Sequence, residues 1–373
     1  MKGKRAVEAG IVFFGIVCLL FLPPAAAGDK TVLRDRARRL AKVGNYPPRA
    51  WEDALVFENS LYKVTTNTSE EVAKYICLLM SFAQKTYRSI FCFDEETPQF
   101  QVYAFRTYAE YEEGLRKIGL SSHPGFRSSG LFVEHKGLSC IYLPYERVPT
   151  NDSRPTCVLL HEGTHQFARM GLDFKVPEAD RDRLQGRPLT LPSTPRWLNE
   201  GLADYLETSF YNGEKLIVGH INRSNLMQLQ AEIKAGKSIP FSKLFRASDE
   251  QFNTSYYAAA WGVVYWFIHS SDTELQAKRR EYFRAYLCCV RKGFMENPET
   301  EFSTRFFKKG RNFAQTWESY EKREGYNALL RVMFGEKATG KDLEEWEKGW
   351  KQWVLSLNPK DNYGGLYPDY YGF

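Results

Sequence analysis

The sequence has few histidines and no Cys-x-x-Cys pair of cysteines. Its 373 residues include six His and seven Cys, and the absence of a Cys-x-x-Cys motif argues against a cysteine-based metal site. Internal repeats and low-complexity segments are also lacking, which argues against a repeat array or a disordered chain. The net charge of +6 is too small for this length to indicate nucleic-acid binding. The hydrophobic content of 43% can bury a full core, in one large or two modest domains.

Long apolar runs are scarce too, and the run near the N-terminus has the composition of a secretory signal. A basic start at Lys2–Arg5 precedes an apolar stretch at Ala9–Leu22, and small residues then lead to Ala27. We expect cleavage after Ala27. Removing residues 1–27 takes away three basic residues and one acidic residue, so the net charge falls from +6 to +4. The mature chain is expected to be secreted or periplasmic without a stable membrane span, and a retained N-terminal anchor is the alternative.

The mature chain keeps six cysteines and four sequons for N-glycosylation. An even number of cysteines in an exported chain permits disulfides, although their connectivity stays open. The sequons begin at Asn67, Asn151, Asn222 and Asn253. They matter only in a host that glycosylates its exported proteins.

Hydrophobic periodicity divides the chain into a part that contains a sheet and a part that is helical. Strands are expected at 61–66 and 100–105, and a hairpin at 130–143, with helices between them. From Arg154 onward nearly all segments have a helical period. The predicted organisation is a signal peptide (1–27), a lead-in helix and linker (28–56), a small mixed α/β sheet unit (57–150), a helical part (151–357) and a Gly- and Tyr-rich tail (358–373). Within the helical part, later helices are expected at 222–235, 255–270, 273–291, 326–334 and 341–357.

The histidines are not evenly spread, because two of the six form the motif H-E-x-x-H. Residues four apart lie on one face of a helix, so His161 and His165 can bind one metal ion, and Glu162 can reach a water molecule beside it. The apolar stretch Val158–Leu160 precedes the motif and Phe167 follows it. The motif is therefore expected on a largely buried helix, where imidazoles without partners would be costly. This pattern predicts one catalytic Zn²⁺ with Glu162 as general base.

A third protein ligand is expected, because catalytic zinc usually has three protein ligands and one open position. Glu200 is the best candidate, on an amphipathic helix downstream of the motif. A Thr194 N-cap and Pro195 at the first helical position are expected to begin this helix. Asp204 lies four residues after Glu200 and could accept the second N–H of a ligating histidine. The alternative assignment makes Asp204 the ligand and Glu200 its support.

Together the two motifs resemble those of the gluzincins, the thermolysin-like and aminopeptidase-like zinc peptidases. The closer resemblance is to bacterial peptidase-MA-like domains of largely unassigned function, over about residues 57–357. The spacing of Glu200 and Asp204 is similar to that of the thermolysin group. The resemblance implies an α+β, zincin-like fold and a peptide or protein substrate. The aminopeptidase signature G-x-M-E-N is absent, and the 34 residues between His165 and Glu200 exceed the aminopeptidase spacing.

Hydrolysis of an amide creates an oxyanion, which gluzincins stabilise with a Tyr or His donor. Tyr257 resembles the family's tyrosine, and small alanines follow it on a predicted helix. His220 is the alternative donor. The expected activity is thus peptide hydrolysis by a metal-activated water, with Glu162 as base and Tyr257 as oxyanion donor. The alternative is a non-catalytic module that binds peptide or cell-wall material on the same scaffold. The sequence leaves the oligomeric state and the substrate open.

Overall fold

The computed structural model describes two large parts of the chain and the junction between them. The described residues are 49–91, 97–120, 129–133, 136–143, 154–171, 195–211, 216–270, 326, 329–330, 333–335, 337 and 339–359. The predicted signal peptide, the lead-in up to residue 48, the helix expected at 273–291 and the tail from residue 360 lie outside them. Within the described ranges, no helix has both the length and the apolar character needed to cross a bilayer.

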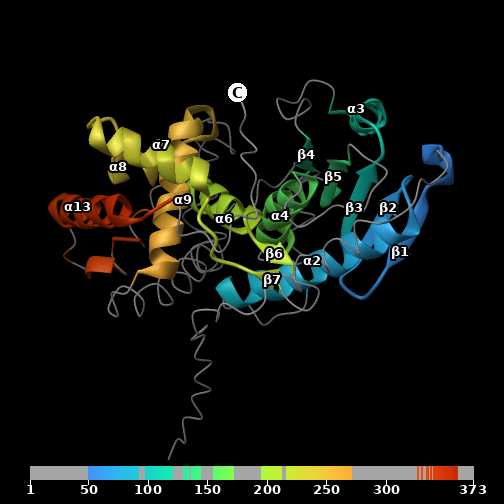
Figure 1. Cartoon of the computed structure of the whole chain (residues 1–373), viewed down its shortest axis with the longest axis horizontal. Coiled ribbons are helices and arrows are strands. Elements are labelled where there is room, and N and C mark those ends of the chain that lie inside the picture. Colours follow the sequence, from blue (N-terminus) through green and yellow to red (C-terminus); the bar gives the residue numbers. More distant parts are fainter. Residues whose placement is uncertain are drawn as a thin grey trace, which may run out of the picture.

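A five-stranded mixed sheet forms the first part, with the strand order β1-β2-β3-β5-β4 (Figure 1). Its strands are β1 (Leu55–Glu58), β2 (Tyr62–Thr66), β3 (Phe100–Phe105), β4 (Gly130–Val133) and β5 (Leu138–Tyr142). Strands β2, β3 and β5 run parallel, and the antiparallel strands β1 and β4 form the two edges. The hairpin predicted at 130–143 is confirmed as β4 and β5. Strand β1 begins at Leu55, so the sheet starts two residues inside the segment expected as a linker.

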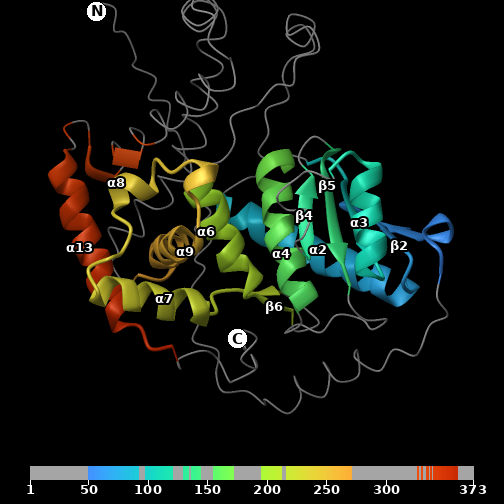
Figure 2. The ribbon, with the colours of Figure 1, turned by 90° about the horizontal axis from the view of Figure 1, so that it is seen from above.

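Helices cover both faces of this sheet. Helix α2 (Glu70–Phe91) follows Ser69, whose Oγ accepts the Val72 N–H at 3.3 Å, and a capping box at Thr107 starts α3 (Tyr108–Lys117). The alternate residues of β2 that are buried pack in one core with α2 and α4 (Arg154–Gln166). A second core lies under α3. Figure 2 shows α3 and α4 on opposite sides of β4 and β5, so α4 covers the face opposite α3 at the β4 end of the sheet.

The second part is helical and surrounds the apolar helix α9. Beyond α4 its elements are a π-helical turn η4 (Phe167–Gly171), α6 (Arg196–Glu207), α7 (Arg223–Lys234), α8 (Phe241–Leu244), α9 (Thr254–His269) and α13 (Gly340–Ser356), with the short strands β6 (Phe210–Tyr211) and β7 (Leu216–Ile217) and the 3₁₀ turns η1 (Trp51–Asp53) and η6 (Asp249–Gln251). Helix α6 packs between α4 and α9, as Figure 1 shows. The expected start of α6 is wrong by one residue: Pro195 is the N-cap and Arg196 the first helical residue. The fixed φ of Pro195 suits either position, but its ψ of 140° is extended.

The asparagines of two predicted sequons are buried and hydrogen-bonded inside the protein. Asn67 is fully buried, donates to the Arg49 carbonyl at 3.2 Å and accepts the Arg106 N–H at 2.9 Å. Asn222 is 6% exposed, and its amide also bonds inside the protein. A glycan on either nitrogen is incompatible with these contacts. Asn253 caps α9 at the surface, and Asn151 lies outside the described residues.

A glycine allows α6 to pack closely against α9. A Cβ at Gly201 would lie 2.6 Å from the Ala260 carbonyl oxygen and 2.9 Å from Cγ2 of Val264. The first of these atoms belongs to the backbone, which cannot move aside as a flexible side chain can. Gly201 directly follows Glu200, so the packing distance between the two helices also sets the position of that carboxylate.

We expect Gly201→Ala to lower the free energy of unfolding by about 1–3 kcal/mol, because overpacking a helix contact costs this much. Thermal melting in the presence of a chelator measures the effect without a contribution from bound metal. Gly349→Ala on α13 is the matched control, since a Cβ added there would have no atom within 4 Å, and it should leave the melting temperature unchanged or raise it. Equal melting temperatures for the two variants would contradict the close α6–α9 contact.

Candidate metal centre

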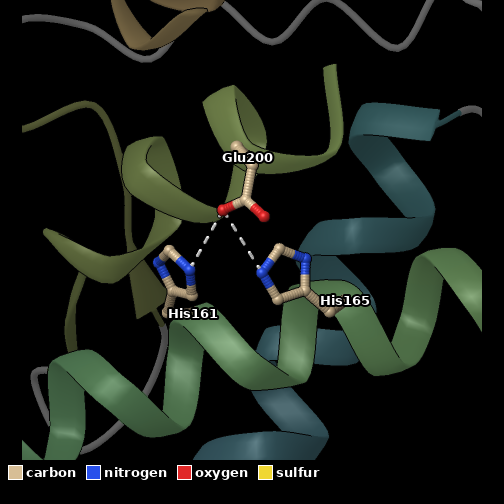
Figure 3. A group of neighbouring side chains, drawn as sticks. All are labelled: His161, His165 and Glu200. Carbon is tan, nitrogen blue, oxygen red and sulfur yellow. Dashed lines mark ion pairs between the residues drawn. The ribbon is translucent and has the colours of Figure 1, made fainter. Parts of the chain in front are cut away.

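Helix α4 presents both histidines of the H-E-x-x-H motif to α6. Their Nε2 atoms point at one oxygen of Glu200 (Figure 3): Oε2 lies 3.4 Å from Nε2 of His161 and 3.5 Å from Nε2 of His165. Packing fixes the helix that carries them, since Tyr87 of α2 donates to the Leu160 carbonyl at 3.0 Å. The structure therefore brings together the three residues that the sequence predicts as metal ligands.

These three side chains fit a metal ion better than they fit one another. Glu200 is 2% exposed, and its Oε2 is buried without a hydrogen-bond partner among the described residues. A buried carboxylate oxygen of this kind needs a hydrogen-bond donor or a positive charge as its partner. Zinc bonds of about 2.0–2.1 Å in a tetrahedron separate two ligand atoms by about 3.3–3.4 Å. The two distances from Oε2 come close to that separation, and two imidazoles with one carboxylate form an established donor set for catalytic zinc.

The carboxylates at the site stabilise positive charge beside them. Burial acts to lower the pKa of His161, but the neighbouring carboxylates of Glu200 and Glu207 outweigh it and raise this pKa well above its usual range. Burial likewise acts to raise the pKa of Glu200, but the adjacent His165 and His161 hold it well below its usual range. Glu200 is thus a carboxylate at neutral pH, as a metal ligand must be.

The second oxygen of Glu200 is held by an arginine one helical turn earlier. Nη2 of Arg196 lies 2.9 Å from Oε1 of Glu200 and donates to the Tyr257 hydroxyl at 3.4 Å. The Arg196 guanidinium also lies over the ring of Phe252, 5.6 Å from its centroid. This contact assigns the two oxygens of Glu200 to different partners, with Oε1 on the arginine and Oε2 toward the histidines.

Glu162 lies on the side of α4 that faces the edge strand β4. Its Oε2 accepts the backbone N–H of Phe132 at 2.7 Å. The Tyr142 N–H donates to the Ser129 carbonyl, and hydrogen-bonded pairs alternate along an antiparallel ladder. The backbone N–H of Phe132 therefore points away from β5. One oxygen of Glu162 is thereby fixed at the free edge of the sheet. Gly130 makes this approach possible, because a Cβ there would lie 2.3 Å from Cγ1 of Val158 on α4.

Of the two predicted oxyanion donors, Tyr257 lies beside the ligand group. It is in the first turn of α9, and its hydroxyl accepts from Arg196. Burial, and after it the charge of Glu200, raises the pKa of Tyr257 to about 12, so the phenol keeps its proton at neutral pH. His220 lies near the other end of α6, where its carbonyl accepts from Thr208 at 3.0 Å, and burial lowers its pKa. This placement favours Tyr257.

Asp204 is close to the second ring nitrogen of His161, as predicted, but another carboxylate is closer. Oδ1 of Asp204 lies 3.5 Å from Nδ1 of His161, whereas Oε2 of Glu207 lies 3.1 Å from it. Burial, and after it the charge of Glu207, raises the pKa of Asp204 well above its usual range. His161, Asp204 and Glu207 also have donor atoms within 4.8 Å of one another. That group shares its histidine with the first site, and each of its carboxylates is also bonded to an asparagine amide.

Three parts of this site are not predicted from the sequence. Arg196 and Glu207 are charged residues on an amphipathic helix, and such residues usually face solvent. Their spacing from Glu200, four residues before and seven after, is the one signal that places them on its helix face. The third part, the N–H of Phe132, belongs to the backbone and leaves no trace in the residue type.

Comparison with known families adds one result. Residues 156–284 match a family described as "Protein of unknown function (DUF1570)". This uncharacterised family resembles peptidase MA-like domains, in line with the resemblance seen in the sequence. The matched segment contains the histidines of the H-E-x-x-H motif, Glu200 and Tyr257. It begins after the hairpin formed by β4 and β5, which it therefore does not include. Comparison with curated proteins gives no match.

Proposed function

We propose that this protein is an exported zinc-dependent peptidase with a zincin-like fold. The buried Glu200 carboxylate carries the proposal, because its Oε2 makes no hydrogen bond among the described residues and lies 3.4 and 3.5 Å from two imidazole nitrogens. The proposed ligands are His161, His165 and Glu200. When bound there, zinc would polarise the scissile carbonyl and lower the pKa of a water molecule to about 7.

The chain's own groups supply the remaining chemistry. Glu162 takes the proton of the attacking water and returns it to the leaving amine. The Phe132 N–H holds Oε2 of Glu162, which leaves Oε1 for the proton transfer. Tyr257 can donate its hydroxyl proton to the oxyanion: arginine has no acceptor, so the contact with Arg196 uses a lone pair of the phenol and not its proton.

Metal content and peptide cleavage test the proposal directly. The purified mature chain should contain about one zinc per chain by elemental analysis, and it should cleave members of a random peptide library read out by mass spectrometry. A chelator should abolish cleavage and added zinc restore it. Zinc without cleavage of any peptide would leave the non-catalytic binding module as the better assignment. A chain that takes up no zinc when zinc is supplied would overturn the proposal.

Tyr257→Phe should lower kcat by about 10²–10³-fold, the usual effect of losing one oxyanion donor, and should leave the zinc affinity unchanged. Steady-state kinetics on a peptide identified from the library measure the first effect, and zinc titration the second. Tyr256→Phe is the matched control, since this neighbouring tyrosine packs on Phe252, and among the described residues its hydroxyl makes no hydrogen bond with Arg196 or Glu200. An unchanged kcat in Tyr257→Phe would reopen the case for His220.

A further inference from the structure

His161 has two ring nitrogens that face different partners on α6. Its Nε2 faces Glu200 and the proposed metal, and its Nδ1 faces the C-terminal turn of the helix. A neutral imidazole that binds a metal through one nitrogen carries its proton on the other and donates it to an acceptor. That acceptor fixes the orientation of the ring, so its identity matters for how tightly the metal is held.

Glu207 is the acceptor with hydrogen-bonding geometry. Its Oε2 lies 3.1 Å from Nδ1 of His161 and makes a hydrogen bond with it. Oδ1 of Asp204 lies 3.5 Å from the same atom, beyond the usual range of about 2.7–3.2 Å for an N–H···O bond. Asp204 is instead drawn toward α7, where its Oδ2 accepts from the Asn225 amide at 2.8 Å.

The other oxygen of Glu207 is held by the N-cap residue of α7. Its Oε1 accepts from Nδ2 of Asn222 at 2.9 Å. Asn222 is the N-cap of α7, and its Oδ1 accepts the Asn225 N–H at 3.2 Å. A hydrogen-bonded chain thus runs from the His161 ring through Glu207 and Asn222 to a helix N-terminus, whose partial positive charge favours a carboxylate nearby.

We propose that Glu207, held by Asn222, is the residue that positions His161 for metal binding, in place of the Asp204 that its position in the sequence predicts. The inference rests on the proposed zinc site. The sequence predicts Asp204 for this role. Glu207 lies one turn beyond Asp204 on the same helix, and its longer side chain reaches back to Nδ1 of His161. Asp204 lies farther from Nδ1 of His161, because its other oxygen is bonded to Asn225 of α7.

Zinc affinity in two matched variants tests the inference, because Glu207→Gln and Asp204→Asn each replace a carboxylate by an amide of the same shape. Competition with a chromophoric chelator gives the dissociation constants. Glu207→Gln should weaken zinc binding by about 10-fold or more, as loss of a contact to a metal-binding histidine does, and Asp204→Asn should weaken it less. The Co²⁺-substituted protein should show a shifted visible absorption spectrum in Glu207→Gln and a spectrum close to wild type in Asp204→Asn.

A third variant keeps the test decisive if Glu207→Gln does not fold. Asn222→Ser retains an N-cap for α7 but removes the amide that holds Glu207, so it should also weaken zinc binding, with a metal-free melting temperature close to wild type. A larger loss in Asp204→Asn than in both other variants would overturn the assignment to Glu207. Equal zinc affinities in all variants would overturn it too, while leaving the zinc site intact. No zinc binding by the wild type would overturn the zinc site itself and this inference with it.

Discussion

Glu162→Gln should lower kcat for peptide cleavage by about 10²–10⁴-fold, the usual contribution of a general base, while the chain still binds one zinc. The amide has the shape of the carboxylate, and its oxygen can still accept the Phe132 N–H, so the contact between α4 and β4 survives. What the amide cannot do is take a proton from water. The expected result is therefore a folded, zinc-loaded and inactive protein.

The measurement combines kinetics, elemental analysis and a matched surface variant. Glu113→Gln removes a carboxylate from α3 that is half exposed and pairs with Arg116, and it should change neither kcat nor zinc content, because exposed ion pairs contribute little. Peptide-cleaving activity that persists near the wild-type level in Glu162→Gln would show that Glu162 is not the base. Loss of zinc in this variant would show instead that Glu162 supports the metal.

Glu200→Ala should have the second large effect, a loss of zinc affinity of more than about 100-fold. Contacts outside the ligands are already worth about 10–100-fold, and this change removes a ligand. It also leaves His161, His165 and Arg196 facing one another without the carboxylate between them. Zinc at 100 times its dissociation constant should stabilise the wild type by about 2.7 kcal/mol and should not stabilise the variant.

Melting curves with and without zinc, run beside elemental analysis, measure this difference. Glu250→Ala is the control, because Glu250 is an exposed residue of the turn before α9. It should bind zinc as the wild type does. If Glu200→Ala kept one zinc at wild-type affinity, the third ligand would lie elsewhere, and Asp204 would be the next residue to replace.

The sequence predicts the parts of this fold that have a strong period or a chemical motif. The alternation of β3 and the helical period of α7 and α9 give elements within about one residue of those observed. Strand β1 has only partly buried or exposed residues, and β6 and β7 are two residues long. None of these three has enough alternation to be seen in the sequence.

The site also divides into residues that a motif predicts and residues that it does not. The H-E-x-x-H motif and Glu200 could be assigned to one site because metal binding restricts both residue type and spacing. The choice between Asp204 and Glu207 depends on a difference of 0.4 Å in their distances to Nδ1 of His161, 3.5 against 3.1 Å. That difference arises from α7, which lies later in the chain and carries no motif. Only the packed structure shows it.

The hydrogen bond between Phe132 and Glu162 has a consequence for how such chains can diverge. The segment from α4 to α9 contains every proposed metal ligand, whereas the amide that holds the base comes from a hairpin encoded earlier. These two stretches can change independently during evolution. A descendant with an altered hairpin would keep the proposed metal ligands and lose the group that holds the proposed base, and so become a binding protein. In related chains, the β4 hairpin is therefore the region to inspect when enzymes are to be told apart from binders.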